Sequence, residues 1–164
     1  MQSRHAFALA VLGLVLASPA RAQEGTWQIV GAARYVAHYE GQTVRGTIPF
    51  ALTATLAPDG RYDVVGLACS VTDPPTVLTG TWTRGSNRFL RAVVRDGIAA
   101  NITGCGGSGV RVSDLHVRQR SAADQTAVTG GFSATVRYQF TSGDERETLR
   151  ARVRGEYTGT RVGE

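Results

Sequence analysis

Lysine is absent from this 164-residue sequence, and cysteine, methionine and histidine are scarce. All 18 basic residues are arginines, set against 13 acidic residues. The two cysteines, one methionine and three histidines are too few for a metal-binding tract, and the cysteines do not stand at metal-ligand spacing. We therefore expect no metal site and no cofactor. With abundant alanine, glycine and valine, the all-arginine composition is typical of a codon bias.

Long apolar runs are also missing, with one short exception near the start. Arg4, an apolar run over residues 6–17 and the Ala-Arg-Ala triplet at 20–22 form the pattern of a cleavable secretory signal. The run is shorter than the roughly twenty residues that a membrane-spanning helix needs. We therefore predict a signal peptide over 1–22 and a single secreted or periplasmic domain over 23–164, with no membrane span.

The cysteines, Cys69 and Cys105, both lie in the part expected to be exported, where thiols oxidise. We predict a disulfide bond between them. In the loop-entropy model a crosslink that encloses ~37 residues stabilises a domain by roughly 4 kcal/mol. A redox role is not favoured, because the sequence has no Cys-x-x-Cys pair.

Apolar and polar residues alternate with a period of two at the N-terminal end of the expected domain. Odd positions from Trp27 to Tyr39 and even positions from Val44 to Leu56 are apolar or small. This pattern predicts two strands with one buried face each. A turn at residues 40–42 that keeps both apolar faces on one side pairs Tyr39 with Val44 and Trp27 with Leu56.

The same alternation over residues 128–157 predicts a second hairpin at the C-terminal end. Its register sets Gly155 opposite Phe132 and Gly130 opposite Tyr157. Aromatic rings that cover cross-strand glycines are a device of sharply bent sheets. The glycines on the apolar faces therefore favour a barrel.

The middle of the chain predicts strands over residues 61–69, 77–84 and 110–120, and one ambiguous segment over 88–103. A hairpin turn at Asp96-Gly97 would give nine strands and would place the two cysteines at opposite ends of the sheet. A bulge there makes 88–103 one long strand and brings the cysteines to the same end, as a disulfide requires. We therefore prefer eight strands.

These strands predict an all-β fold: a single eight-stranded antiparallel up-and-down barrel, with a β-sandwich as the alternative. No internal helix is indicated. Within residues 110–120 the apolar positions change parity, which predicts a bulge near Ser113 and Asp114.

Motifs that could carry catalysis are weak. The G-x-G-x-x-G spelling at residues 104–109 leads into a strand, so no helix N-terminus follows it to bind a phosphate. His38 and His116 stand in no triad-like grouping, and the carboxylates lie singly near turns. The sequence thus favours a non-catalytic protein.

Arg150, Arg152 and Arg154 share one face of the last strand, with Arg137 across from Arg150. This basic stripe could meet an anionic surface or partner, although a solvated strand face is the preferred interpretation. Exposed aromatics do not interleave with it, so we expect no nucleic-acid binding.

The triplet Gly25-Thr26-Trp27, at the start of the first strand, resembles the G-x-W opening of lipocalins, which are members of the calycin barrels. The resemblance implies an eight-stranded barrel with a cup for a small apolar ligand. It also implies that the tryptophan closes the base of the barrel under a late-strand arginine, here Arg154 or Arg161.

The leading hypothesis is an exported, non-catalytic binding barrel for a small apolar molecule. Its expected ligand-lining residues are Trp27, Tyr35, Phe50, Trp82, Phe132 and Tyr138.

The alternative is a protein-interaction module, either an inhibitor or an envelope-associated partner, that acts through loops at residues 73–75 and 104–109. A packed lumen would favour this alternative. The sequence does not indicate an oligomeric state.

Overall fold

The computed structural model describes residues 24–67, 76–83, 88–104, 109–142 and 144–163, which form seven strands and one helix. The expected signal peptide, Cys69 and Cys105 lie outside these residues. The elements are β1 (Gly25–Tyr39), β2 (Gln42–Leu56), β3 (Arg61–Leu67), β4 (Thr76–Thr81), α2 (Arg88–Gly104), β5 (Val110–Ser121), β6 (Ala127–Ser142) and β7 (Glu145–Val162).

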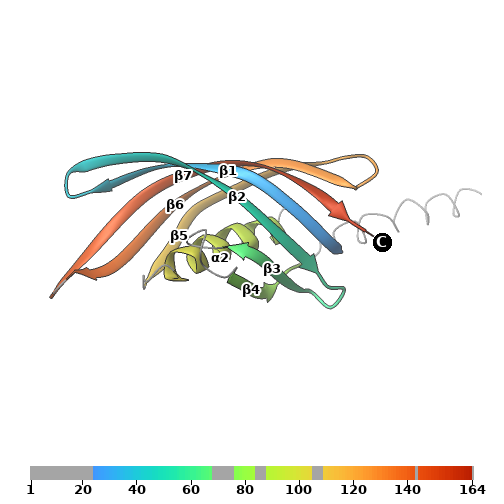
Figure 1. Cartoon of the computed structure of the whole chain (residues 1–164), viewed down its shortest axis with the longest axis horizontal. Helices are drawn as coiled ribbons and strands as arrows, with labels where there is room; N and C mark the ends of the chain where they lie inside the picture. The colour runs from blue at the N-terminus through green and yellow to red at the C-terminus, as the bar shows by residue number, and fades with distance from the viewer. Residues whose placement is uncertain (1–23, 68–75, 84–87, 105–108, 143, 164) are drawn as a thin grey trace, which may run out of the picture.

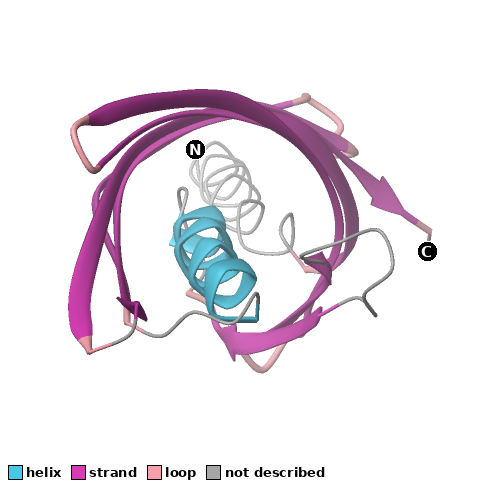
Figure 2. Ribbon diagram, turned by 60° about the vertical axis from the view of Figure 1, so that its left-hand side comes forward, coloured by secondary structure: helices cyan, strands magenta, loops and turns pink. Residues whose placement is uncertain are grey.

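The strands form a single antiparallel sheet in the order β4-β3-β2-β1-β7-β6-β5. The first strand pairs with the last, as it does in an up-and-down barrel. The sheet curls around α2 as an open half-barrel, which Figure 2 shows in cross-section. In the described part of the chain, β4 and β5 are the two edges and do not pair. The all-β fold is therefore confirmed, but the expected closed barrel of eight strands is not what the protein forms.

The correction concerns the ambiguous segment, which is the helix α2 and not a strand. Phe89, Leu90, Val93 and Gly97 are buried, at spacings of one, three and four residues that place them on one helix face. Arg91 and Arg95 lie between these residues in the sequence and are exposed. The interpretation of Asp96-Gly97 as a bulge was wrong, since both residues lie within the helix.

The two long hairpins differ in how well their register was predicted. In the C-terminal hairpin, Gly155 pairs with Phe132 and Gly130 with Tyr157, as expected. In the N-terminal hairpin, Tyr39 pairs with Gln42, two residues away from the expected partner. The turn there is Glu40-Gly41, with φ angles of 48° and 73°, and a two-residue turn of this kind fits the twist of the strands. A shift of two keeps every side chain on its expected face.

The expected bulge in β5 is confirmed. The pairing of β5 with β6 shifts between Ser113 and His116, and Asp114 adopts a left-handed φ of 53°. The extra residue lets the apolar positions before and after the bulge face the same side of the sheet, and Val117 is buried there.

The hydrophobic core lies between α2 and one end of the curled sheet (Figure 1). Tyr62 of β3 packs edge-on against Phe89 of α2, with ring centroids 6.1 Å apart, and its hydroxyl donates a hydrogen bond to Asp96. Burial, followed by this hydrogen bond, raises the pKa of Tyr62 above its ordinary range. The buried members of the core are Trp27, Ile29, Ala54, Leu56, Tyr62, Val64, Trp82, Phe89, Leu90, Val93, Val117, Val128, Phe132 and Tyr157.

Candidate functional site

The core covers only part of the concave face of the sheet. Strand β3 pairs with residues 53–56 at the end of β2, and α2 contacts β3, β4 and β5. The rest of the long strands extends past α2, as the left half of Figure 1 shows. We call the concave face of this extension the distal trough. Its lining residues are Tyr35, Ala37, Tyr39, Val44, Ile48, Val112, Val136, Tyr138, Phe140, Leu149 and Ala151.

The floor of the distal trough is a row of small apolar side chains across five strands. The row is Val44, Ala37, Ala151, Val136 and Val112, each the register partner of the next. Ala37, Ala151 and Val136 are buried, although none of them belongs to the core cluster. Ala37, Ala151 and Val136 are only 5%, 7% and 2% exposed, so their neighbours cover the middle of the row.

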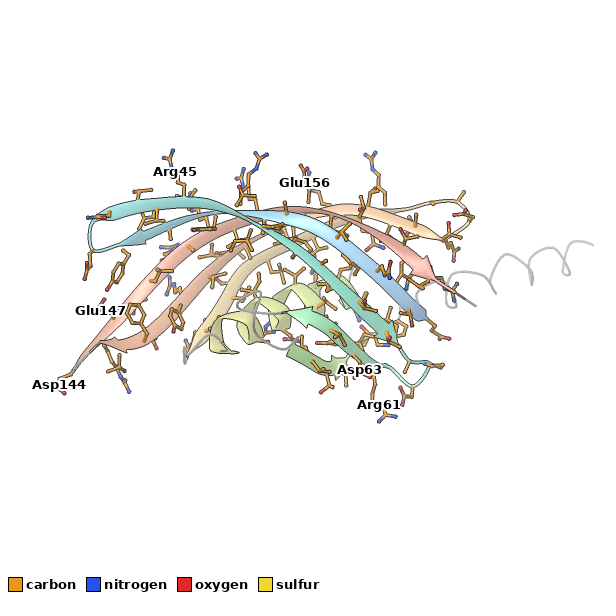
Figure 3. The ribbon with its side chains drawn as sticks, viewed as in Figure 1. Arg45, Arg61, Asp63, Asp144, Glu147 and Glu156 are labelled. Atoms are coloured by element: carbon orange, nitrogen blue, oxygen red, sulfur yellow. The ribbon has the colours of Figure 1, made fainter. Side chains whose placement is uncertain are left out.

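Aromatic rings form the wall of the distal trough toward the tips of the hairpins. Phe140 lies between Tyr39 and Tyr138, with ring centroids 5.7 Å and 5.4 Å away. The Tyr39 hydroxyl donates a hydrogen bond to a carboxylate oxygen of Glu147 on β7. This hydrogen bond raises the pKa of Tyr39 above its ordinary range. The hydrogen bond to Glu147 thus ties the wall from β1 to β7, and Figure 3 labels Glu147 at this end.

The rim of the distal trough on β2 is apolar and exposed. Val44 is 48% exposed and Ile48 is 54% exposed, although both lie on the concave face. Between them, the Tyr35 ring lies over Gly46, where a Cβ atom would come within 2.6 Å of it. Large apolar side chains left open on a concave surface are typical of binding sites.

The structure divides the expected ligand-lining residues between the core and the distal trough. Trp27, Trp82 and Phe132 are core residues, and Phe50 packs against the core with its ring 6.2 Å from that of Phe132. They are core residues because α2, which the sequence analysis missed, fills the lumen beside them. Only the two remaining residues, Tyr35 and Tyr138, line the distal trough.

Sequence reasoning missed several other lining residues, notably Tyr39, Val44, Ile48 and Phe140. The signal that could have found them is the alternation itself, which places them on the same faces as Tyr35 and Tyr138. The alternation does not indicate where along the strands the core ends.

Of the two arginines expected to lie near Trp27, Arg161 is the one placed there. It is the register partner of Trp27, and its Nε lies 3.0 Å from the position of a Cβ on Gly25. That Nε is buried. Arg154 is exposed on the opposite face of β7, across from Arg34 of β1.

The remaining titratable residues serve turns or lie at the surface. Backbone and side-chain hydrogen bonds from Arg61 lower the pKa of Asp59, and those from Thr126 lower the pKa of Asp124. His38 is exposed, and its Nδ1 forms a hydrogen bond with the Thr43 hydroxyl oxygen 3.1 Å away. Over the described ranges, no three His, Cys, Asp or Glu side chains gather as a metal site, and no helix is long and apolar enough to span a membrane.

The loops at residues 73–75 and 104–109, expected to serve as an interaction surface, lie mostly outside the described residues. Residues 73–75 and 105–108 lie outside the described residues, as do the two cysteines beside them.

No protein-family model matches the sequence, and a search of curated proteins finds no match. Among solved structures, the chain matches the crystal structure of the ywiB protein from Bacillus subtilis at 8% sequence identity. The match covers 84% of this chain and 94% of that chain, with a TM-score of 0.27. A likeness at this level does not show a shared fold.

Proposed function

We propose that this protein is an exported, non-catalytic binding protein whose distal trough takes a small apolar molecule. The observation that carries the proposal is the contrast between the two ends of the concave face. At one end α2 and the sheet pack together, and at the other end Val44 and Ile48 remain about half exposed beside a wall of aromatic rings.

The chemistry of the distal trough favours an apolar ligand. Its rim presents the exposed Val44 and Ile48 side chains, and its wall presents Tyr39, Tyr138 and Phe140. Each square ångström of apolar surface that a ligand covers contributes about 25 cal/mol. The Glu147 carboxylate accepts the hydrogen bond from the Tyr39 hydroxyl, so the wall offers an acceptor that favours ligands with a hydrogen-bond donor at one end.

The resemblance to lipocalins agrees with this proposal. Trp27 of the G-x-W triplet and Arg161 of the last strand are register partners, and Trp27 belongs to the core that packs against α2. The first and last strands pair, as in an up-and-down barrel. The apolar run and Ala-Arg-Ala triplet near the start support export.

The proposal is tested with a neutral apolar fluorophore, N-phenyl-1-naphthylamine, titrated into the mature chain. We expect saturable fluorescence enhancement at one site. Ile48→Asn places a polar group in the distal trough and is expected to weaken binding at least tenfold, since burying one aliphatic side chain is worth roughly 1.5–3 kcal/mol and 1.4 kcal/mol is about tenfold.

Val30→Asn is the matched control. Val30 is 52% exposed, like Ile48, but lies on the convex face of the neighbouring strand. We expect the control variant to bind the fluorophore as the wild type does. Equal weakening by both variants, or no saturable binding by the wild type, would contradict the proposal. If the wild type and the control bind and Ile48→Asn does not, extraction of the protein from its native host, with mass spectrometry of the extract, identifies the natural ligand.

A further inference from the structure

The convex face of the sheet carries a continuous field of arginines. It extends over β2, β1, β7, β6 and β5, and every arginine in it is exposed. Figure 3 shows Arg45 projecting from this side of the molecule. We call this surface the convex arginine face. Its arginines are Arg34, Arg45, Arg111, Arg118, Arg120, Arg137, Arg146, Arg150, Arg152 and Arg154.

Several of these arginines are direct cross-strand partners of each other. Arg34 pairs with Arg154, and Arg137 lies between Arg150 on one side and Arg111 on the other. Like charges directly opposite each other destabilise a sheet. A solvated strand face has no need of such pairs, since charges of mixed sign keep an edge or surface soluble equally well.

Neighbouring carboxylates do little to neutralise the face. On the five strands that form it, Glu156 is the described acidic residue that projects in the same direction, and Asp114 stands at the bulge of β5. In the described parts of the chain, the ion pair found is Arg61 with Asp59, which belongs to a turn away from this face. The arginines therefore create a broad positive potential.

Hydroxyl side chains are interspersed with the arginines. Thr43, Thr47, Ser113 and Thr148 are exposed on the same face, in rows next to arginine positions. Guanidinium groups form paired hydrogen bonds with carboxylate and similar oxyanions, and hydroxyl groups both donate and accept hydrogen bonds. A ligand with anionic groups and many hydroxyl groups matches both features.

We propose that the convex arginine face binds an acidic polysaccharide, a flexible single chain with repeated anionic groups. The curvature of the face favours such a ligand, because a flexible chain can follow a convex surface (Figure 1). A bilayer is flat on the scale of one domain and would contact only the most protruding part of the convex arginine face. A nucleic-acid duplex is stiff, with a persistence length of about 50 nm, and would also touch along one line.

Single-stranded nucleic acid fits the face less well. Its bases bind by stacking on aromatic side chains. The aromatic residues of these five strands, such as Tyr35 and Tyr138, all occupy concave positions. The face thus offers charge and hydroxyl groups but no stacking platform.

The test measures binding of the mature chain to labelled heparin and polygalacturonate fragments by fluorescence anisotropy. Neutral dextran, oligo(dT) and phosphatidylglycerol vesicles serve as the other probes. Two triple variants remove the same formal charge from different surfaces. They are R150Q with R152Q and R154Q on the sheet, and R88Q with R91Q and R95Q at exposed positions of α2.

We expect the sheet variant to bind both acidic polysaccharides at least tenfold more weakly than wild type and to lose part of the salt dependence of binding. The helix variant is expected to bind within twofold of wild type. Thermal melting serves as the folding check, and the sheet variant is expected to melt no lower than wild type, because it loses like-charge pairs.

Three results would overturn the proposal. The first is an equal loss of binding in the two variants, which would show unspecific attraction to net charge. The second is tighter binding to oligo(dT) or to the vesicles than to either polysaccharide. The third is binding to dextran as tight as binding to the acidic polysaccharides.

Discussion

Gly155 of β7 lies directly opposite Phe132 of β6, and the Phe132 ring covers it so closely that a Cβ atom there would lie 2.3 Å from ring carbon Cε1. The same arrangement places Tyr157 over Gly130 and Tyr62 over Gly80. The rings occupy the space of the missing side chains, which allows the sheet to bend tightly around α2.

A Gly155→Ala substitution is therefore expected to lower the free energy of unfolding by about 1–3 kcal/mol, as overpacking in a dense core does. Urea denaturation measures the loss. Gly131→Ala is the control, because a Cβ there would lie 3.1 Å from a backbone oxygen and meet no ring. Equal losses in both variants would show that the covering ring is not the cause.

The boundary between the core and the distal trough predicts a difference between two aliphatic truncations. Leu90 of α2 is 4% exposed, so Leu90→Ala should cost about 2–5 kcal/mol. Ile48 is 54% exposed, so Ile48→Ala should change the free energy of unfolding by no more than about 0.5 kcal/mol. Chemical denaturation of both variants checks this. A large loss for Ile48→Ala would mean that the distal trough belongs to the core.

The hydrogen bond between Tyr39 and Glu147 predicts a shifted titration at the aromatic wall. The carboxylate holds the phenol in its protonated form, so the pKa of Tyr39 lies above the ordinary tyrosine value. Glu147→Gln removes the negative charge and should lower the pKa of Tyr39 toward that value. Titration followed by tyrosine NMR signals measures the change, with Glu156→Gln on the convex face as the control. An unchanged titration in Glu147→Gln would contradict the contact.

Burial raises the pKa of Tyr157 to about 12, from an ordinary value of 10.0. The unfolded chain therefore loses this proton at a lower pH than the folded protein does. The stability contributed by the protonated phenol is complete below pH 10 and falls as the pH rises toward 12. Tyr157→Phe should flatten the decline of the free energy of unfolding across this interval, as urea denaturation at several pH values would show. A decline of unchanged slope would contradict the assignment.

The like-charge pair of Arg34 and Arg154 predicts a stabilising substitution. Arg154→Gln should raise the free energy of unfolding by about 0.2–1 kcal/mol at low salt, because it removes a direct cross-strand repulsion. The gain should shrink at high salt. Arg91→Gln on α2 is the control and should change little, since Arg91 is exposed on the helix. A loss of stability in Arg154→Gln would show that the arginine makes a favourable contact.

The alternation of side chains was sufficient to predict most strands and their faces. The C-terminal register was correct because the glycines and the rings of Phe132 and Tyr157 fit together in only one way. The predicted N-terminal register was wrong by two residues, because the alternation does not indicate the length of the turn at Glu40-Gly41.

The sequence of α2 did not distinguish a helix from a strand. Its short apolar stretches fit both periods, and the expected disulfide favoured a strand that ended near Cys105. The missed helix also affects the expected ligand-lining residues. Because α2 lies inside the half-barrel, Trp27, Trp82 and Phe132 belong to the core. Tyr35 and Tyr138 are not part of the core cluster, so their assignment as ligand-lining residues stays a prediction.

The open edges at β4 and β5 have a mechanical consequence. In a closed barrel, strand number and stagger set the diameter, and no strand can move outward without breaking its ladder. Here no described backbone pairing joins β4 to β5, and α2 contacts both of these edge strands. In the described sheet, no closed ladder of backbone hydrogen bonds therefore sets the distance between β4 and β5. Over the described residues the sheet is a split ring, whose two edge strands face each other across α2 and share no backbone ladder.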